Sequence, residues 1–357
     1  MVDAARLRIV FFGTPDFAVA TLDALLRSRH PVVGVVTRAD RPRDRGQKTS
    51  EPPVKARAIA AGLPVLQPER LKDEGFLAAF AAFDPDLIVL AAYGKILTDA
   101  VLATPRLGVL NVHASLLPRY RGAAPVHRAV INGDRDTGVT IMKMVKALDA
   151  GPMLAVARHP IGPDDTSEDV EVALGLIGAD LLVATVDSLA AGPVPEVQQD
   201  EAGATYAHRI TKEDGVVDWT QPAERIHNLI RALYPWPHAH AFYRGRRLIL
   251  LRSMVVGEVP DPDGVGDKIR LKPDPTYEGA SEVRLKPDAM YERLRGRGEA
   301  APPGTILEAA GDRLHVATGE GTLAVTQIQA EGKRPMTSRE FLAGHHLAAG
   351  EILTPHP

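Results

Sequence analysis

The first half of the chain alternates short apolar segments with segments of helical periodicity, and this alternation restricts the possible folds most strongly. The apolar runs at residues 7–12, 32–37, 64–66, 86–92 and 107–112 are predicted as strands, and residues 17–27, 53–61 and 71–83 as helices. Strands that alternate with helices form a parallel sheet covered on both faces. The sequence therefore predicts a Rossmann-like, doubly wound, mostly parallel α/β sheet, whose ligands bind beyond the carboxyl ends of the strands.

The second half of the chain changes character. Strands at 138–145 and 154–159 and a long helix at 167–190 complete the first domain, and the Gly- and Pro-rich run at 191–195 marks a linker. From about residue 244 short strands are separated by Gly and Pro, which is typical of a small β-barrel. We expect a first domain over residues 1–191, a linker over 192–206 and a second domain over 207–357.

Composition excludes several classes of protein. A chain of 357 residues is long enough for two domains. It contains no cysteine, which excludes disulfides, thiolate catalysis and cysteine-based zinc sites. Its net charge of −3 excludes a general polycation, so a nucleic acid would have to bind through a local basic patch.

Three expected absences concern membrane, export and metal. The N-terminus lacks the basic and apolar segments of a secretory signal, and no stretch is expected to reach the roughly 20 apolar residues that cross a bilayer. We therefore expect a cytoplasmic protein without membrane attachment. The histidine pairs His238/His240 and His345/His346 match no closed zinc site, so no metal is expected.

Asn111 and His113 are the main candidates for catalysis. Residues two apart on a strand point to the same side, so both side chains project together where the strand at 107–112 ends. Asp149 follows the strand predicted at 138–145. An amide can stabilise an oxyanion, an imidazole can accept a proton near pH 7, and a carboxylate can fix the tautomer of that imidazole. The alternative is an inert, hydrogen-bonded pair at a strand end.

A basic loop follows the second predicted strand. Residues 38–48 carry four arginines and one lysine against two aspartates. Such a loop at the carboxyl edge of a sheet can dock on phosphates or unpaired bases, which favours RNA contact. The alternative is an ordinary solvated loop.

The turn after the first strand argues against a nicotinamide enzyme. Gly13-Thr-Pro-Asp-Phe17 is not the Gly-x-Gly-x-x-Gly fingerprint that binds dinucleotides on this fold. We interpret it as a plain strand-to-helix turn in which Thr14 or Asp16 caps the helix.

These motifs together resemble a known family. Asn111, His113, the Ser-Leu-Leu-Pro run at 115–118, the Arg-Gly-Ala-Ala-Pro run at 121–125 and Asp149 are similar to the signature of the formyltetrahydrofolate-dependent formyltransferases. The resemblance extends from Arg8 to His345 and fails only near 258–302. It implies that the second domain is a barrel of the oligonucleotide-binding type.

Within that family the chain is most similar to members that formylate the methionyl initiator tRNA for translation initiation. The resemblance implies that 10-formyltetrahydrofolate is the donor and that the partners are methionyl initiator tRNA and folate. We expect the protein to be a monomer. It assigns an oxyanion contact to Asn111, proton transfer to His113 and support of His113 to Asp149. Tetrahydrofolate would contact Ser115, Leu116, Leu117 and Pro118. The tRNA would contact Arg41, Arg43, Arg45 and Lys48, with Arg45 entering the acceptor stem.

The segment near 258–302 does not belong to the family pattern. It contains a tandem repeat, because residues 269–278 are echoed by residues 283–292. Two copies are too few for a solenoid, so an inserted surface loop or hairpin is expected. It either extends an RNA-binding face or is a neutral duplication in a tolerant loop.

Two rival functions remain open. The same three residues would serve an enzyme whose acceptor is a nucleotide amino-sugar or water, although a small acceptor needs neither the basic loop nor the barrel. A non-catalytic RNA-binding module is a different class of protein, and it would not need the Asn, His and Asp set.

Overall fold

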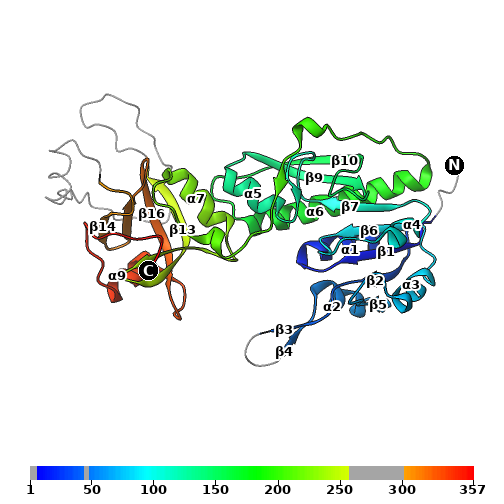
Figure 1. Ribbon diagram of the computed structural model, residues 1–357, viewed down its shortest axis with the longest axis horizontal. Coiled ribbons are helices and arrows are strands. Elements are labelled where there is room, and N and C mark those ends of the chain that lie inside the picture. Colours follow the sequence, from blue (N-terminus) through cyan, green and yellow to red (C-terminus); the bar gives the residue numbers. More distant parts are fainter. Residues whose placement is uncertain (1–5, 44–47, 257–300) are drawn as a thin grey trace, which may run out of the picture. The chain divides into compact units, whose positions relative to one another are not determined.

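The computed structural model describes residues 6–43, 48–256 and 301–357. The chain divides into two compact units, Met1–Thr211 and Lys212–Pro357, which are described separately (Figure 1). Nearly all of the inserted segment predicted near 258–302, with its tandem repeat, lies outside the described residues. Residues 192–206, predicted as a linker, belong to the first unit, where Val197 forms a bridge with Met153.

The first unit is built on a seven-stranded sheet in the order β10-β9-β7-β6-β1-β2-β5. Its strands are β1 (Ile9–Gly13), β2 (Val32–Val36), β5 (Val65–Leu66), β6 (Leu87–Ala91), β7 (Val109–His113), β9 (Asp136–Lys143) and β10 (Met153–Pro160). The pairs that join β5, β2, β1, β6 and β7 are parallel, whereas β9 is antiparallel to β7 and β10 is antiparallel to β9. The predicted mostly parallel α/β sheet is therefore confirmed.

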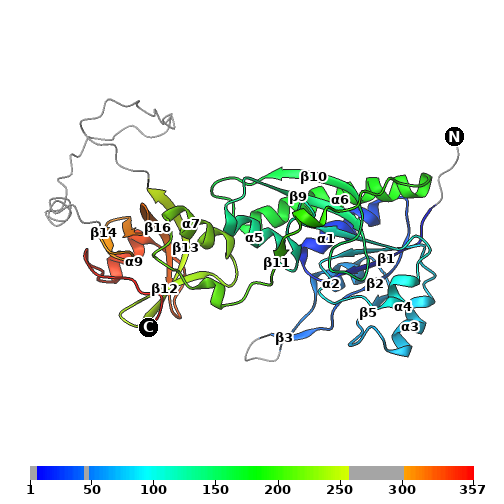
Figure 2. The same cartoon turned by 45° about the horizontal axis from the view of Figure 1, so that its top comes forward.

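Helices cover both faces of this sheet. They are α1 (Asp16–Arg27), α2 (Pro53–Ala60), α3 (Glu74–Ala81), α4 (Asp99–Ala103), α5 (Pro125–Asn132) and α6 (Ser167–Ala191). On one face Phe12 of β1 meets Phe80 of α3 edge-on, with ring centroids 5.7 Å apart. On the other face α1 and α6 pack side by side (Figure 2). At Gly178 of α6 a Cβ would lie 2.9 Å from Val112 of β7, so this glycine permits the close approach.

The expectation that no stretch is long and apolar enough to cross a bilayer is wrong for α6. An 18-residue window of this helix has a mean hydropathy of 1.8, and it is the one helix of the described chain that meets this length and composition. Leu174 and Leu182 are wholly buried, and the helix packs against α1 and β9. A capping box of Thr166 and Asp169 begins the helix. Burial in the first unit accounts for part of its apolar composition.

The second unit is an antiparallel sheet in the order β12-β13-β16-β15-β14, with β17 paired to β16. Its elements are β12 (Ala239–Tyr243), β13 (Arg246–Val256), β14 (Ile306–Ala310), β15 (Arg313–Ala317), β16 (Thr322–Ala330), β17 (Met336–Thr337), α7 (Ala223–Ala232) and α9 (Ser338–Gly344). The C-terminal segment reaches both edges, because Thr354 bridges Phe242 of β12 and Ile352 bridges Thr305 beside β14. The sheet thereby closes into the predicted small barrel.

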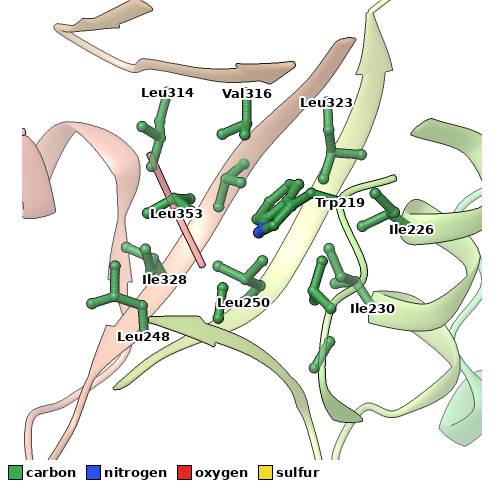
Figure 3. Packing of buried hydrophobic residues seen from close by; sticks show 14 of the residues in the cluster. Trp219, Ile226, Ile230, Leu248, Leu250, Leu314, Val316, Leu323, Ile328 and Leu353 are labelled. Atoms are coloured by element: carbon green, nitrogen blue, oxygen red, sulfur yellow. The ribbon is translucent and has the colours of Figure 1, made fainter. Parts of the chain in front are cut away.

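The core of this barrel surrounds Trp219. Its indole packs among apolar side chains that come from α7 and from the inner faces of the strands (Figure 3). Trp219 is only 3% exposed, and Leu250, Leu314 and Val316 are wholly buried. Residues on a strand point alternately to its two faces, so each strand directs part of its side chains into this core.

Gly138 on β9 offers a test of how tightly the sheet packs. A Cβ at this position would lie 2.1 Å from the carbonyl oxygen of Ala157 and 2.5 Å from Leu116. Because the first of these is backbone, Gly138→Ala should lower the free energy of unfolding by about 1–3 kcal/mol, measured by urea unfolding. Gly75→Ala on α3 is the control, since a Cβ there meets no atom within 4 Å, and it should gain at most about 1 kcal/mol. Equal stability of the two variants would contradict this packing.

Candidate active site

Asn111 and His113 lie at the carboxyl end of β7 and point to the same side, as their spacing predicts. They are 6% and 5% exposed. Among the described residues, no hydrogen bond engages the side-chain amide of Asn111. A buried amide normally has a hydrogen-bond partner, which makes the N–H groups of Asn111 a candidate contact for a ligand.

The His113 ring is oriented by a backbone carbonyl. Its Nε2 lies 3.0 Å from the carbonyl oxygen of Tyr120. A carbonyl can only accept a hydrogen bond, so Nε2 carries the proton of the neutral ring and donates it to Tyr120. This leaves Nδ1 as the nitrogen that can accept a proton. The sequence predicts that Asp149 fixes the tautomer of His113, whereas in the structure the Tyr120 carbonyl does so.

Asp149 faces the other nitrogen of the ring. Its Oδ2 lies 3.8 Å from His113 Nδ1, which is too long for a hydrogen bond but close enough for a carboxylate to stabilise an imidazolium. The backbone N–H of Gly122 donates to the same Oδ2 at 2.9 Å. Asp149 is 7% exposed and has a φ of +45°, a backbone conformation that is uncommon for residues other than glycine.

The order of the strands along the chain does not explain why Asp149 lies beside His113. Because β9 is antiparallel to β7, its last residue, Lys143, lies opposite Leu110 and away from the carboxyl end of β7. The segment 144–152 must therefore turn back along β7 before β10 begins at Met153. The resulting loop brings the carboxylate beside His113.

The run from Ser115 to Pro118 follows His113 directly and is fixed by internal hydrogen bonds. Thr140 of β9 donates to the Ser115 carbonyl at 2.7 Å and accepts from the Leu117 N–H at 3.2 Å. Ser115 is wholly buried, while Leu116 and Pro118 are partly exposed. The predicted folate residues thus form a rigid turn whose accessible surface comes mainly from Leu116 and Pro118.

The segment after β6 borders the same region, because Ala91 pairs with Val112 of β7. Tyr93 is wholly buried in this segment, and burial raises the pKa of its hydroxyl to about 12. Tyr93 therefore remains neutral at physiological pH and packs edge-on against Phe12 of β1, with ring centroids 5.2 Å apart.

The predicted basic loop is an antiparallel hairpin at its base. β3 (Arg41–Arg43) pairs with β4 (Lys48–Ser50), and the two strands project from the first unit (Figure 1). The predicted tip residue Arg45 lies outside the described residues. The base is anchored, since Lys55 of α2 donates to Asp40 at 2.5 Å and Gln67 donates to the same carboxylate at 2.7 Å. The hydrogen bond from Lys55 holds the pKa of Asp40 below its usual value.

Three groups that form hydrogen bonds in the site are not predicted by the sequence patterns. The Tyr120 carbonyl and the Gly122 N–H are backbone groups, which leave no residue-type signal. Gln199 lies in the predicted linker, yet its amide donates to the carbonyls of Asp149 and Gly151 at 2.8 and 2.7 Å. Within the described ranges, no group of three or more His, Cys, Asp or Glu side chains is placed to hold a metal ion.

Both halves of the chain match formyl transferase family models. The family model described as "Formyl transferase" matches residues 7–186, and the one described as "Formyl transferase, C-terminal domain" matches residues 209–346. The chain is 41% identical over 347 residues to the methionyl-tRNA formyltransferase of Moorella thermoacetica, covering 97% of this chain and 99% of that protein. It is 42% identical over 348 residues to the one from Roseiflexus sp., covering 97% and 95%.

Among solved structures the fold resembles WlaRD, a sugar 3N-formyl transferase studied in the presence of dTDP and 5-N-formyl-THF. The TM-score is 0.60 at 14% identity, and the match covers 92% of this chain and all of that one. This likeness concerns the fold.

Proposed function

Because the chain belongs to the formyl transferase family, we propose that it transfers the formyl group of 10-formyltetrahydrofolate to the free amino group of methionyl initiator tRNA. The relatives that are about 40% identical over nearly the whole chain are named methionyl-tRNA formyltransferase. The observation that carries the chemistry is the grouping of an available amide, an oriented imidazole and a carboxylate around the end of β7.

The proposed reaction begins with attack of the amino nitrogen on the formyl carbon. Asn111 donates an N–H to the formyl oxygen as that oxygen becomes negative. His113 accepts the proton of the attacking amine at Nδ1, since Nε2 already donates to Tyr120. Asp149 then stabilises the imidazolium from 3.8 Å. Collapse of the intermediate breaks the bond from the formyl carbon to N10, and the released tetrahydrofolate nitrogen takes a proton from His113 or water.

A modest base suffices for this reaction. An α-amino group in a peptide has a pKa of about 7.7–8.0, and the amino group of an ester-linked aminoacyl residue should have a lower one. A substantial fraction of the acceptor is therefore unprotonated near pH 7. The main tasks of the site are orientation and stabilisation of the oxyanion.

The folate-derived donor is supported by the family and by the sugar formyl transferase of similar fold that was studied with 5-N-formyl-THF. We assign its binding to the turn from Ser115 to Pro118, where apolar side chains can cover a flat ring and backbone groups can bind its edge. Ser115 acts through the hydrogen bonds that shape the turn, and Leu116 and Pro118 offer the contact surface.

The tRNA substrate would meet the hairpin that carries Arg41, Arg43, Arg45 and Lys48. Arginine and lysine side chains neutralise phosphates, and Asp40 at the start of this segment is held by Lys55 of α2. We further propose that the enzyme acts as a cytoplasmic monomer that needs no metal.

Arg45→Ala should raise the KM for methionyl-tRNA about tenfold and leave the slow hydrolysis of 10-formyltetrahydrofolate unchanged, because one phosphate or base contact is worth roughly 1–3 kcal/mol. For tRNA binding by the variant, the slope of the logarithm of the binding constant against the logarithm of the salt concentration should be about one unit shallower. Steady-state kinetics at several salt concentrations measure both effects. Equal losses in tRNA formylation and in hydrolysis would exclude the hairpin as an RNA contact.

A further inference from the structure

We propose that Gln199, held by Arg121 and Glu201, is a positioning residue that fixes Asp149 beside His113. This inference rests on the proposed function, in which Asp149 supports the charged form of His113. The loop of Asp149 turns back along β7, and Asp149 adopts a φ of +45°. A carboxylate on such a segment keeps its place only when surrounding groups determine the backbone.

Gln199 makes the contacts that determine that backbone. Its Nε2 donates to the carbonyl of Asp149 at 2.8 Å and to the carbonyl of Gly151 at 2.7 Å. Its Oε1 accepts from Nε of Arg121 at 3.0 Å. Both carbonyls can only accept and the guanidinium can only donate, so the orientation of the amide is fixed by its partners. Gln199 is 9% exposed, which strengthens its dependence on these bonds.

Arg121 is in turn held by Glu201, which lies at the protein surface. Its side chain is 2% exposed and forms a two-pronged pair with Glu201, at 3.0 Å from Nη1 and 2.8 Å from Nη2. Glu201 itself is 70% exposed. A bidentate pair fixes the plane of the guanidinium, and that plane directs Nε toward Gln199.

One short strand contacts the side chain of Asp149 directly and its backbone through Gln199. β8 (Arg121–Gly122) pairs in parallel with β11 (Tyr206–Ala207), and the N–H of Gly122 donates to the Asp149 carboxylate. One residue of β8 therefore binds the side chain of Asp149, while its neighbour Arg121 binds the backbone of Asp149 through Gln199. The segment that the sequence suggests as a linker thus supports the active site.

Gln199→Glu tests this arrangement with little change of shape. The new carboxylate keeps an acceptor for Arg121 but cannot donate to the two carbonyls, so the loop should loosen. Amide hydrogen exchange of residues 147–151 should accelerate at least about tenfold, and kcat for methionyl-tRNA should fall about 10- to 100-fold with KM for tRNA unchanged. The exposed neighbour Gln198 offers the matched control, since Gln198→Glu should alter neither quantity.

A second variant separates positioning from general loss of structure. When Gln199→Glu is added to Asp149→Asn, kcat should fall less than about twofold below that of Asp149→Asn alone, because the two residues act as a unit. The inference would be overturned if the two substitutions lowered kcat by the product of their separate effects. It would also be overturned if amide hydrogen exchange of residues 147–151 in Gln199→Glu stayed at the wild-type rate. If Gln199→Glu does not fold, Glu201→Gln at the exposed end should still accelerate loop exchange. Failure of the wild-type protein to formylate methionyl-tRNA would refute the proposed function, and hydrogen exchange would still decide the role of Gln199.

Discussion

His113→Ala is expected to lower kcat for methionyl-tRNA formylation about 100- to 10,000-fold, the range that a positioned general base contributes. The variant loses the one nitrogen that the Tyr120 carbonyl leaves available for a proton. It also loses the group that Asp149 faces at 3.8 Å. The measurement is single-turnover formylation with saturating tRNA and donor, which separates chemistry from binding.

Stability of the variant must be measured beside its activity, because His113 is buried. His356→Ala is a matched control, since that histidine is exposed near the C-terminus, and it should retain wild-type activity. A His113→Ala enzyme that is folded and within about threefold of wild-type kcat would exclude His113 as the base.

Asp149→Asn should lower kcat about 100- to 1,000-fold, because it removes the charge that stabilises the His113 imidazolium. Asparagine tolerates a positive φ better than most residues, and its side-chain oxygen can still accept from Gly122 N–H. The substitution therefore changes the charge and little else. Asp149→Ala should lower kcat at least as much, since it also removes the acceptor for Gly122.

The two variants are distinguished by comparing kcat with thermal stability. If the carboxylate acts through its charge, Asp149→Asn should unfold near the wild-type temperature and still be slow. Near-normal kcat for Asp149→Asn would mean that Asp149 only shapes the loop, and it would remove the electrostatic part of the proposed mechanism.

Sequence periodicity predicted the parallel sheet of the first unit and the common orientation of Asn111 and His113. Alternating segments predicted that β1, β2, β6 and β7 lie in one parallel sheet, because each strand and helix has a local apolar pattern. The two-residue spacing of Asn111 and His113 predicted their common side for the same reason. Their proposed roles in catalysis remain predictions that the variants above test.

Features that depend on distant backbone groups could not be predicted. The carbonyl of Tyr120 orients His113, and any residue type could supply it. The antiparallel direction of β9 decides how Asp149 returns to β7, and no local pattern encodes strand direction. Gln199 lies among Gly and Pro residues that suggested a linker, although its contacts join it to the first unit. The polar segment 38–48 has the composition of a loop, and the strands of its β3–β4 hairpin are too short to give a strand pattern.

The most direct test of the central claim is a formylation assay with 10-formyltetrahydrofolate and three acceptors offered in parallel. These are methionyl initiator tRNA, methionyl elongator tRNA and an amino-sugar nucleotide, and a sample without acceptor reports hydrolysis. We predict rapid transfer to the methionyl initiator tRNA, with the other acceptors far slower. Transfer only to the amino-sugar nucleotide, or deformylation that is indifferent to any acceptor, would contradict the assignment to methionyl-tRNA.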